Sequence, residues 1–279
     1  MPTFPTPEPI AVTIALPCGD VRLTASERTD TVVEVRPSNP AREADVRAAA
    51  ETRVEFSDGA LLVKAPEQRG WLGRTGSIAV TIALPAGSQV RGDAALGEFQ
   101  AAGRLGACRF KAASGDVQIE QTSALWLETS NGDIAVGRAD GEVHVSSASG
   151  DVRIRHIDGP ATIRNANGEN WIGEITGDLQ ISAAHGDIAV DRAHAGARVK
   201  SASGDIRVGD VRRGTVILET ASGDINVGVG AGSAAWLDVA TVSGDVRNML
   251  DATDGPGDAA DTLELRARTS SGDIVIRRA

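Results

Sequence analysis

Apolar and polar residues alternate through most of the chain, and the alternation restarts at a regular interval. Counted from a glycine that recurs at each interval, Ile or Val stands two and four residues later, as Ile206 and Val208 do after Gly204. Aliphatic residues also stand five and seven residues before it, as Val199 and Ala197 do. Because successive side chains of a strand point to opposite faces, this spacing predicts two strands per interval, each with one buried face.

The interval at which this pattern restarts is nearly constant. Starting at Gly97, the recurring glycines follow at spacings of 18, 17, 18, 18, 18, 18, 19, 21 and 28 residues. Such a period is typical of a solenoid, in which each repeat forms one turn stacked on the previous one. Because crossovers between parallel strands are strongly biased to the right hand, we predict an all-β, right-handed parallel β-helix with turns of about 18 residues. Its corner glycines are Gly115, Gly132, Gly150, Gly168, Gly186, Gly204, Gly223, Gly244 and Gly272.

Each corner glycine is preceded by Ser, Asn or His and followed by an acidic residue. Glycine permits the positive φ of a sharp bend, and the flanking polar side chains can hydrogen-bond to turn amides. One interpretation is therefore that the motif caps turns. The other is a column of carboxylates that binds cations, formed by Asp133, Asp151, Asp187, Asp205 and Asp224.

Carboxylates stacked about 5 Å apart repel one another, so the column requires compensation. Arg153, Arg207 and Arg247 stand at the next outward position and can supply it. Calcium-binding β-rolls carry a Gly-Gly-x-Gly-x-Asp motif twice per turn, whereas this chain has one glycine-aspartate pair per turn. We therefore favour turn capping over cation binding, and expect no resident metal and no other cofactor.

The N-terminal third is less regular than the rest. Val12–Pro17 returns letter for letter as Val80–Pro85, which indicates that this region belongs to the same solenoid. Asn39, followed by Pro40, is a suitable N-cap for a short alanine-rich helix. We expect an extended arm over 1–9, irregular first turns over 10–96 with a capping helix over about 40–55, and a regular β-helix over 97–279 with an acidic loop at about 250–262.

Three local features depart from the repeat. Asn170 stands where Ile or Val is expected, so either its side chain is hydrogen-bonded internally or a bulge turns Trp171 inward. Segment 68–77, which contains Trp71 and three glycines, is the expected contact loop. The last turn, ending at Ile274–Ala279, has little sequence after it to cover its strand edge. We expect that edge to self-associate or to bind a protein partner.

Composition restricts the class of partner. The formal net charge is −10, whereas nucleic acids and anionic membranes attract basic surfaces. No apolar run approaches the roughly 20 residues needed to span a bilayer, and Met1–Pro9 lacks the basic start and apolar core of a signal peptide. The two cysteines, Cys18 and Cys108, fit a reducing compartment. We expect no nucleic-acid partner, no transmembrane segment and a cytoplasmic location.

No residue pattern indicates catalysis. Every acidic repeat position is explained by the corner, and most turns are too short to wall a substrate groove. The four histidines occupy different phases of the turn, without metal-ligand spacing: His144, His156, His185 and His194. The leading hypothesis is therefore a non-enzymatic β-solenoid that presents a long polar surface to another protein, as an interaction or scaffold module.

Two other functions stay open. A surface adhesin or glycan-binding protein would offer aromatic rings to a sugar, but Trp126, Trp171 and Trp236 occupy three different phases of the turn and favour single packing roles. A carbohydrate-active enzyme would need paired carboxylates in one groove, and no Asp of the repeat is distinguished from the others.

The Ser-Gly-Asp-Val/Ile corners, such as Ser203–Ile206, and the Val-Thr-Ile-Ala-Leu-Pro segments closely resemble a widespread bacterial family of β-strand-repeat proteins labelled "putative adhesin". The resemblance covers the chain from about residue 10 to residue 279. It implies a single-stranded right-handed β-helix, with no assigned biochemical function and no defined catalytic residues. The adhesin label implies an envelope or surface location, in contrast to the cytoplasmic one favoured by the N-terminal sequence.

Overall fold

The regular turn of the protein consists of two short strands joined by a glycine corner. Around Gly168, strand β15 (Ala161–Asn167) leads into the corner and strand β16 (Asn170–Ile175) leaves it. Both pair in parallel with the equivalent strands of the next turn, β17 (Leu179–His185) and β18 (Ile188–Ala193). Equivalent residues of successive turns therefore stack about 4.8 Å apart. The prediction of a parallel β-solenoid is confirmed.

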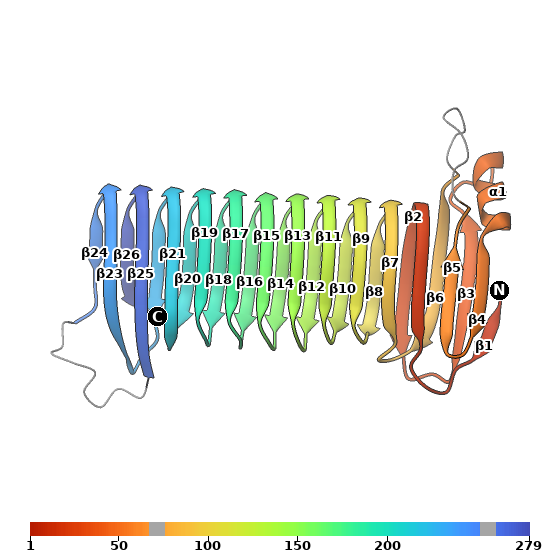
Figure 1. Cartoon of the computed structure of the whole chain (residues 1–279), viewed down its shortest axis with the longest axis horizontal. Coiled ribbons are helices and arrows are strands. Elements are labelled where there is room, and N and C mark those ends of the chain that lie inside the picture. The colour runs from red at the N-terminus through yellow and green to blue at the C-terminus, as the bar shows by residue number, and fades with distance from the viewer. Residues whose placement is uncertain (67–75, 252–260) are drawn as a thin grey trace. The chain divides into compact units, whose positions relative to one another are not determined.

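The computed structural model describes residues 1–66, 76–251 and 261–279, and this part contains 26 strands and one helix. The chain divides into two units, Met1–Asp140 and Gly141–Ala279. Figure 1 labels most of their strands and the helix. The first unit contains β1 (Thr3–Pro5), β2 (Ala11–Ser26), β3 (Asp30–Pro37), α1 (Glu43–Glu51), β4 (Arg53–Ser57), β5 (Ala60–Lys64), β6 (Ile78–Pro85), β7 (Gln89–Leu96), β8 (Phe99–Arg104), β9 (Cys108–Ser114), β10 (Val117–Thr122), β11 (Leu125–Asn131) and β12 (Ile134–Ala139).

The second unit consists of strands only, in the part of it that is described. Besides β15 to β18 it contains β13 (Val143–Ser149), β14 (Val152–Ile157), β19 (Ala197–Ser203), β20 (Ile206–Val211), β21 (Gly214–Ser222), β22 (Ile225–Val229), β23 (Ser233–Ser243), β24 (Val246–Asn248), β25 (Asp261–Ser271) and β26 (Ile274–Arg278).

Each unit has two sheets, which we call sheet A and sheet B. In the second unit, sheet A has the order β14-β16-β18-β20-β22-β26-β24. Its sheet B has the order β13-β15-β17-β19-β21-β25-β23, and all these pairings are parallel. In the first unit, sheet A has the order β1-β3-β6-β2-β8-β10-β12 and sheet B the order β4-β5-β2-β7-β9-β11.

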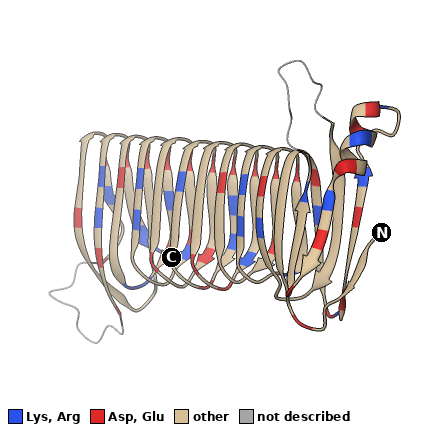
Figure 2. Cartoon of the chain, turned by 45° about the vertical axis from the view of Figure 1, so that its right-hand side comes forward, with Lys and Arg blue, Asp and Glu red and all other residues tan. Residues whose placement is uncertain are grey.

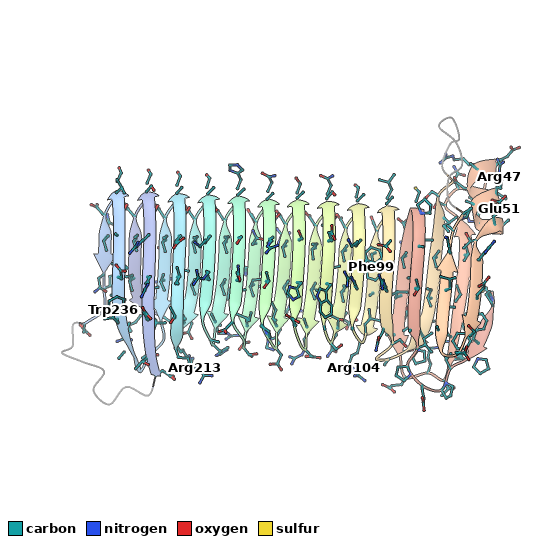
Figure 3. All side chains as sticks on the ribbon, in the orientation of Figure 1. Arg47, Glu51, Phe99, Arg104, Arg213 and Trp236 are labelled. Carbon is teal, nitrogen blue, oxygen red and sulfur yellow. The ribbon has the colours of Figure 1, made fainter. Side chains whose placement is uncertain are left out.

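The core of each turn is made by the aliphatic positions that the repeat predicts. Ile206, Val208 and Val199 are all buried, and each such side chain contributes roughly 1.5–3 kcal/mol. In the first unit an aromatic pair adds to this core, with the rings of Phe99 and Phe110 centred 4.1 Å apart. Figure 3 labels Phe99. Gly92 leaves the space that the Phe110 ring occupies.

The first turn in sequence is not the first in space. Strand β2 spans both sheets, and it lies between β5 and β7 in sheet B and between β6 and β8 in sheet A. The parallel stacking ends one strand beyond it, at β5 and β6, because β3 pairs with β6 and β4 pairs with β5 in antiparallel orientation. The β4–β5 hairpin turns at Asp58 and Gly59, which both have positive φ (49° and 74°).

The helix is shorter than the sequence predicted and begins differently. It runs from Glu43 to Glu51, its N-cap is Arg42, and no side chain hydrogen-bonds there. Asn39 instead accepts a hydrogen bond from the Ala41 amide (2.9 Å), forming a local turn before the helix. At the other end, the segment from Arg53 forms β4 because pairing with β5 satisfies its backbone.

The last turn in sequence is likewise not the last in space. Strand β25 lies between β21 and β23, and β26 lies between β22 and β24. The expectation that the turn ending at Ile274–Ala279 forms the free edge is therefore wrong. Its inward residues are buried and, apart from Thr269, apolar, whereas the outermost turn, β23–β24, carries Asn248 at a core position. The more apolar turn thus occupies the interior slot, where more of its surface is buried.

Candidate functional site

The corner glycines share one backbone conformation that other residues rarely adopt. All nine have φ between 120° and 146°. A side chain would also collide with the neighbouring turn, since a Cβ on Gly204 would lie 2.6 Å from the carbonyl carbon of Gly186. Glycine is therefore required at each corner for two reasons, the positive φ of the residue and the close approach of the neighbouring backbone.

The acidic residues of the corners form a ladder of hydrogen bonds between turns. The Asp205 amide donates to Asp187 Oδ1 (2.9 Å), and the Asp224 amide donates to Asp205 Oδ1 (2.8 Å). Within the first unit the Asp133 amide donates to Asp116 in the same way (2.9 Å). Each carboxylate thus satisfies an amide that the sharp corner leaves without a strand partner.

The same ladder shows that the turns are stacked out of sequence order. The Asp273 amide donates to Asp224 (2.8 Å), and the Asp245 amide donates to Asp273 (2.9 Å). Arginines compensate some of these carboxylates, with Arg153 2.8 Å from Asp151 and Arg247 3.7 Å from Asp245. Across the described residues, no group of three His, Cys, Asp or Glu side chains is placed to hold a metal ion.

A second column of polar side chains lies inside the corners and was not predicted from the sequence. Three residues before several corner glycines stands a buried Thr or Asn whose side chain donates to a glycine carbonyl of the neighbouring turn. Thr220 donates to Gly204 O (3.2 Å), Thr269 to Gly223 O (3.0 Å) and Asn165 to Gly150 O (3.0 Å). The signal was present in the sequence, as polar residues at an inward-facing repeat position.

Asn170 resolves one of the alternatives left by the sequence. Its side chain is buried and donates to Gly168 O (3.2 Å), while Trp171 lies half-buried on the outer side of β16. The internal hydrogen bond satisfies the Nδ2 group of Asn170, while its Oδ1 atom is buried without a partner among the described residues. Trp71, the predicted contact residue, lies outside the described residues. Cys18 and Cys108 are both free thiols, and burial raises the pKa of Cys108 to about 12.

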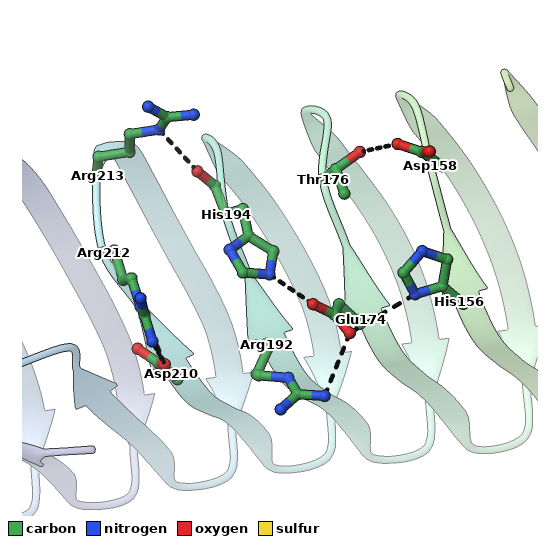
Figure 4. Close-up of polar contacts among 9 residues, drawn as sticks. All are labelled: His156, Asp158, Glu174, Thr176, Arg192, His194, Asp210, Arg212 and Arg213. Carbon is green, nitrogen blue, oxygen red and sulfur yellow. Dashed lines mark hydrogen bonds and ion pairs between the residues drawn. The ribbon is translucent and has the colours of Figure 1, made fainter. Parts of the chain in front are cut away.

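The outer face of sheet A carries a cluster of charged side chains from three consecutive turns (Figure 4). Glu174 lies at its centre, with His194 Nε2 2.7 Å from its Oε1, and Arg192 Nη2 3.2 Å from its Oε2. His156 Nδ1 approaches Oε2 to 3.6 Å from the other side. The hydrogen bond to His194 lowers the pKa of Glu174, with further lowering by Arg192 and the two imidazoles. Glu174 is therefore ionised at neutral pH and is unsuited to act as a general acid.

Elsewhere the outer faces carry acidic and basic side chains interspersed on the strands of both units (Figure 2). Neighbouring turns often pair them, as in Lys200 with Glu219 (2.6 Å) and Lys111 with Glu128 (2.6 Å). Such exposed pairs contribute little to stability individually. They give the solenoid a polar surface without a strong field of one sign.

The outermost turn, β23–β24, is unlike every interior turn of its unit. The core positions of β24 are exposed, with Val246 43% accessible, and those of β23, Leu237 and Val239, are only half-buried. Val242 beside the corner is 88% accessible. Within the described residues β23 is hydrogen-bonded to β25 along one edge and to no strand along the other. The end of the core and a strand edge are therefore both open to solvent here.

One groove lies on the outer face of sheet B close to this end. It has a volume of about 840 Å³ and is lined by Arg213, Gly214, Thr215, Trp236, Asp261, Thr262, Leu263, Glu264 and Arg266. Trp236 is the most exposed aromatic residue among those described, at 58%. This groove could not be predicted from the sequence, because β25 lies between β21 and β23 in space but follows both of them in the chain.

Comparison with solved structures finds similar chains of low identity. A "putative lipid binding protein" from Parabacteroides distasonis is 12% identical with a TM-score of 0.45, and the match covers 100% of this chain and 95% of the other. A "putative adhesin" from Parabacteroides merdae is 12% identical with a TM-score of 0.42 (98% and 94% covered). A "putative adhesin" from Bacteroides fragilis is 16% identical with a TM-score of 0.33 (100% and 95% covered).

No curated protein matches the sequence. The described part of the chain contains no helix long and apolar enough to cross a membrane. The family model called Toastrack DUF4097 matches residues 19–278, which include the corner ladder and the outermost turn of the second unit. The chain therefore belongs to the Toastrack DUF4097 family.

Proposed function

We propose that this protein is a non-enzymatic interaction or scaffold module and that it binds a second copy of itself through the outermost turn, β23–β24. The observation that carries the proposal is the exposure of this turn. Val246 is 43% accessible, whereas the residues at its position in interior turns, such as Ile206 and Ile225, are buried. Val242 and Met249 add further exposed apolar surface to the same turn, at 88% and 62% accessibility. Exposed apolar residues beside an unpaired strand edge are typical of an association surface.

A second copy fits this surface because a strand edge is self-complementary. A two-fold axis beside β23 would place two copies of this 11-residue strand side by side in antiparallel orientation. Backbone donors and acceptors of the free edge would then pair across the axis. The apolar residues at the open end of each core would meet in the same interface. In the first unit the comparable position is closed by the antiparallel strands β3 and β4, so that unit presents no such turn.

Charge modulates this association. Each chain has a formal net charge of −10, so two copies repel one another at low ionic strength. Salt screens that repulsion within about 10 Å at 0.1 M, while apolar contacts and backbone pairing are little affected. Association should therefore strengthen from low salt to about 0.3 M salt, unlike binding driven by ion pairs.

The absence of catalysis in this proposal is supported by how the acidic groups are used. The corner carboxylates accept backbone hydrogen bonds, and Glu174 is held ionised by its neighbours. A hydrolase screen of the purified chain with chromogenic glycosides and esters is expected to give no turnover. Turnover that follows the protein through purification would contradict this part of the proposal.

The association is tested by sedimentation velocity of the full chain over a hundredfold concentration range. A concentration-dependent dimer is expected, and Val242→Lys should abolish it because a charge at a strand edge opposes pairing. Gln180→Lys is the matched control, because it adds the same charge on the outer face of the interior strand β17 and should leave the dimer intact. A chain that stays monomeric at the highest concentration in 0.3 M salt would overturn the proposed association.

A further inference from the structure

The groove on sheet B is assembled by three strands that are distant in sequence. Parallel pairing places Thr215 of β21 opposite Glu264 of β25, and Glu264 opposite Trp236 of β23. These three outward side chains therefore form one row across the strands. Arg266 follows two residues after Glu264 on the same face, and Arg213 lies just before β21 (Figure 3). The groove of about 840 Å³ is within the size range of small-ligand sites.

The polar groups of the groove are fixed in place by one another. Glu264 Oε1 accepts hydrogen bonds from Arg266 Nε (2.9 Å) and Nη2 (2.6 Å). Glu264 Oε2 accepts one from Thr215 Oγ1 (3.4 Å). The Arg266 guanidinium also lies over the Trp236 ring, 6.0 Å from its centre. The carboxylate, guanidinium and indole are thus oriented before any ligand arrives, which lowers the entropy cost of binding.

The remaining charges of the groove are available to a ligand. Arg213 donates from Nε to His194 O (3.1 Å), which positions its guanidinium and leaves its Nη groups free of any ion pair in the described residues. Asp261 also has no ion pair there. One free cation and one free anion therefore flank the exposed indole, and the charges of Arg266 and Glu264 offset each other. The net charge of the groove is close to zero.

This combination selects a ligand class. A phosphate or nucleic acid would meet Glu264 and Asp261, and an organic cation would meet Arg213 and Arg266, so either would face repulsion. A neutral sugar has an apolar C–H face that can stack on an indole, and hydroxyls that both donate and accept hydrogen bonds. We infer that this groove is a binding site for a neutral saccharide, with a sugar ring against Trp236 and its hydroxyls bound by Arg213, Asp261 and Glu264.

A second groove shows why the aromatic ring matters. In the first unit a groove of about 480 Å³ lies between Lys64, Lys111, Glu128 and a series of alanines. It also combines charges of both signs, but no aromatic residue lines it. The inference applies only to the groove at Trp236, and it does not depend on the self-association proposed above, because Trp236 lies on the outer face of β23 and not along its edge.

The test is a titration of the full chain with a panel of neutral oligosaccharides, namely maltohexaose, cellohexaose, laminarihexaose, mannopentaose and chitohexaose, followed by calorimetry and tryptophan fluorescence. At least one is expected to bind, and Trp236→Ala should weaken that binding about tenfold or more. Trp126→Ala is the matched control, because Trp126 also lies half-exposed on the outer face of sheet B, in the first unit. It should leave the affinity within about twofold.

Further outcomes decide the inference. Arg213→Gln should weaken binding less than Trp236→Ala, and melting curves of both variants should match the wild type because both residues are exposed. No binding of any panel member at 10 mM, or equal binding by Trp236→Ala, would overturn the saccharide site. Binding of sulfated or phosphorylated sugars alone would also overturn it. Val242→Lys, which blocks self-association, should still bind the saccharide, so the two proposals fail separately.

Discussion

Both units place a segment near the chain terminus inside the stack of turns, but the two stacks end differently. The segment that lies inside the stack and not at its end is β2 in the first unit and β25–β26 in the second. In the first unit β5 and β6 continue the parallel pairing outside β2, and the antiparallel strands β3 and β4 follow them, with helix α1 packed beside β3. In the second unit the outermost turn is an ordinary parallel turn with nothing beyond it among the described residues. Closure therefore depends on switching strand direction, and the turn that does not switch keeps an open strand edge.

Replacing a corner glycine should give the largest difference in lost stability between an interior turn and the outermost turn. Gly204→Val forces a β-branched residue to φ 134° and into the Gly186 carbonyl. The expected loss is at least about 1–3 kcal/mol of unfolding free energy, because the turns on both sides prevent relaxation. Gly244→Val, at the same conformation in the outermost turn, should cost clearly less, since that turn can move outward. Denaturant unfolding of both variants measures this, and equal losses would contradict the difference in closure.

Removing a corner carboxylate should give a smaller difference in lost stability between an interior turn and the outermost turn. Asp205→Ala leaves the Asp224 amide without its acceptor and should cost about 1 kcal/mol. Asp245 accepts no backbone hydrogen bond among the described residues, because its turn is outermost, and its ion pair with Arg247 is long at 3.7 Å. Asp245→Ala should therefore leave the melting temperature nearly unchanged. A comparable loss in both variants would show that the ladder does not account for the acidic column.

Acidification should have the smallest effect on stability. It tests the contacts that Glu174 makes with the turns on both of its sides. Glu174 is held by His156 from one neighbouring turn and by Arg192 and His194 from the other, and its folded-state pKa lies below the ordinary 4.5. A carboxylate with a lowered pKa stabilises the fold above pH 4.5, and this contribution is lost as the pH falls through the lowered value. We expect less than about 1 kcal/mol, because the cluster is partly exposed.

Glu174→Gln measures that contribution. The stability difference between the wild type and this variant should be largest near neutral pH and should shrink on acidification toward pH 3. A difference that is constant from pH 7 to pH 3 would show that the charge of Glu174 has no part in it. Glu219→Gln, which removes one exposed pair with Lys200, is the control for a carboxylate with a single partner.

Much of the regular turn followed from the sequence because its causes are local. The period of two along each strand and the glycine at each bend reflect the geometry of single residues and their neighbours. The helix start was predicted wrongly because Asn39 had two local options. Buried Asp45 accepts hydrogen bonds from the Asn39 amide (3.1 Å) and the Ser77 amide (3.0 Å), and this long-range contact fixes the segment before the helix.

By itself, then, the sequence determined the architecture of one turn: two strands, a glycine corner, an acidic residue to satisfy the next amide, and a column of Ile and Val as the core. Only the tertiary structure decided the order in which the turns stack. Equivalent turns offer nearly identical edges to one another, so local pattern cannot choose among them, and the choice falls to the turn that buries most apolar surface in an interior slot. The groove of Thr215, Glu264 and Trp236 exists because that choice placed β25 between β21 and β23.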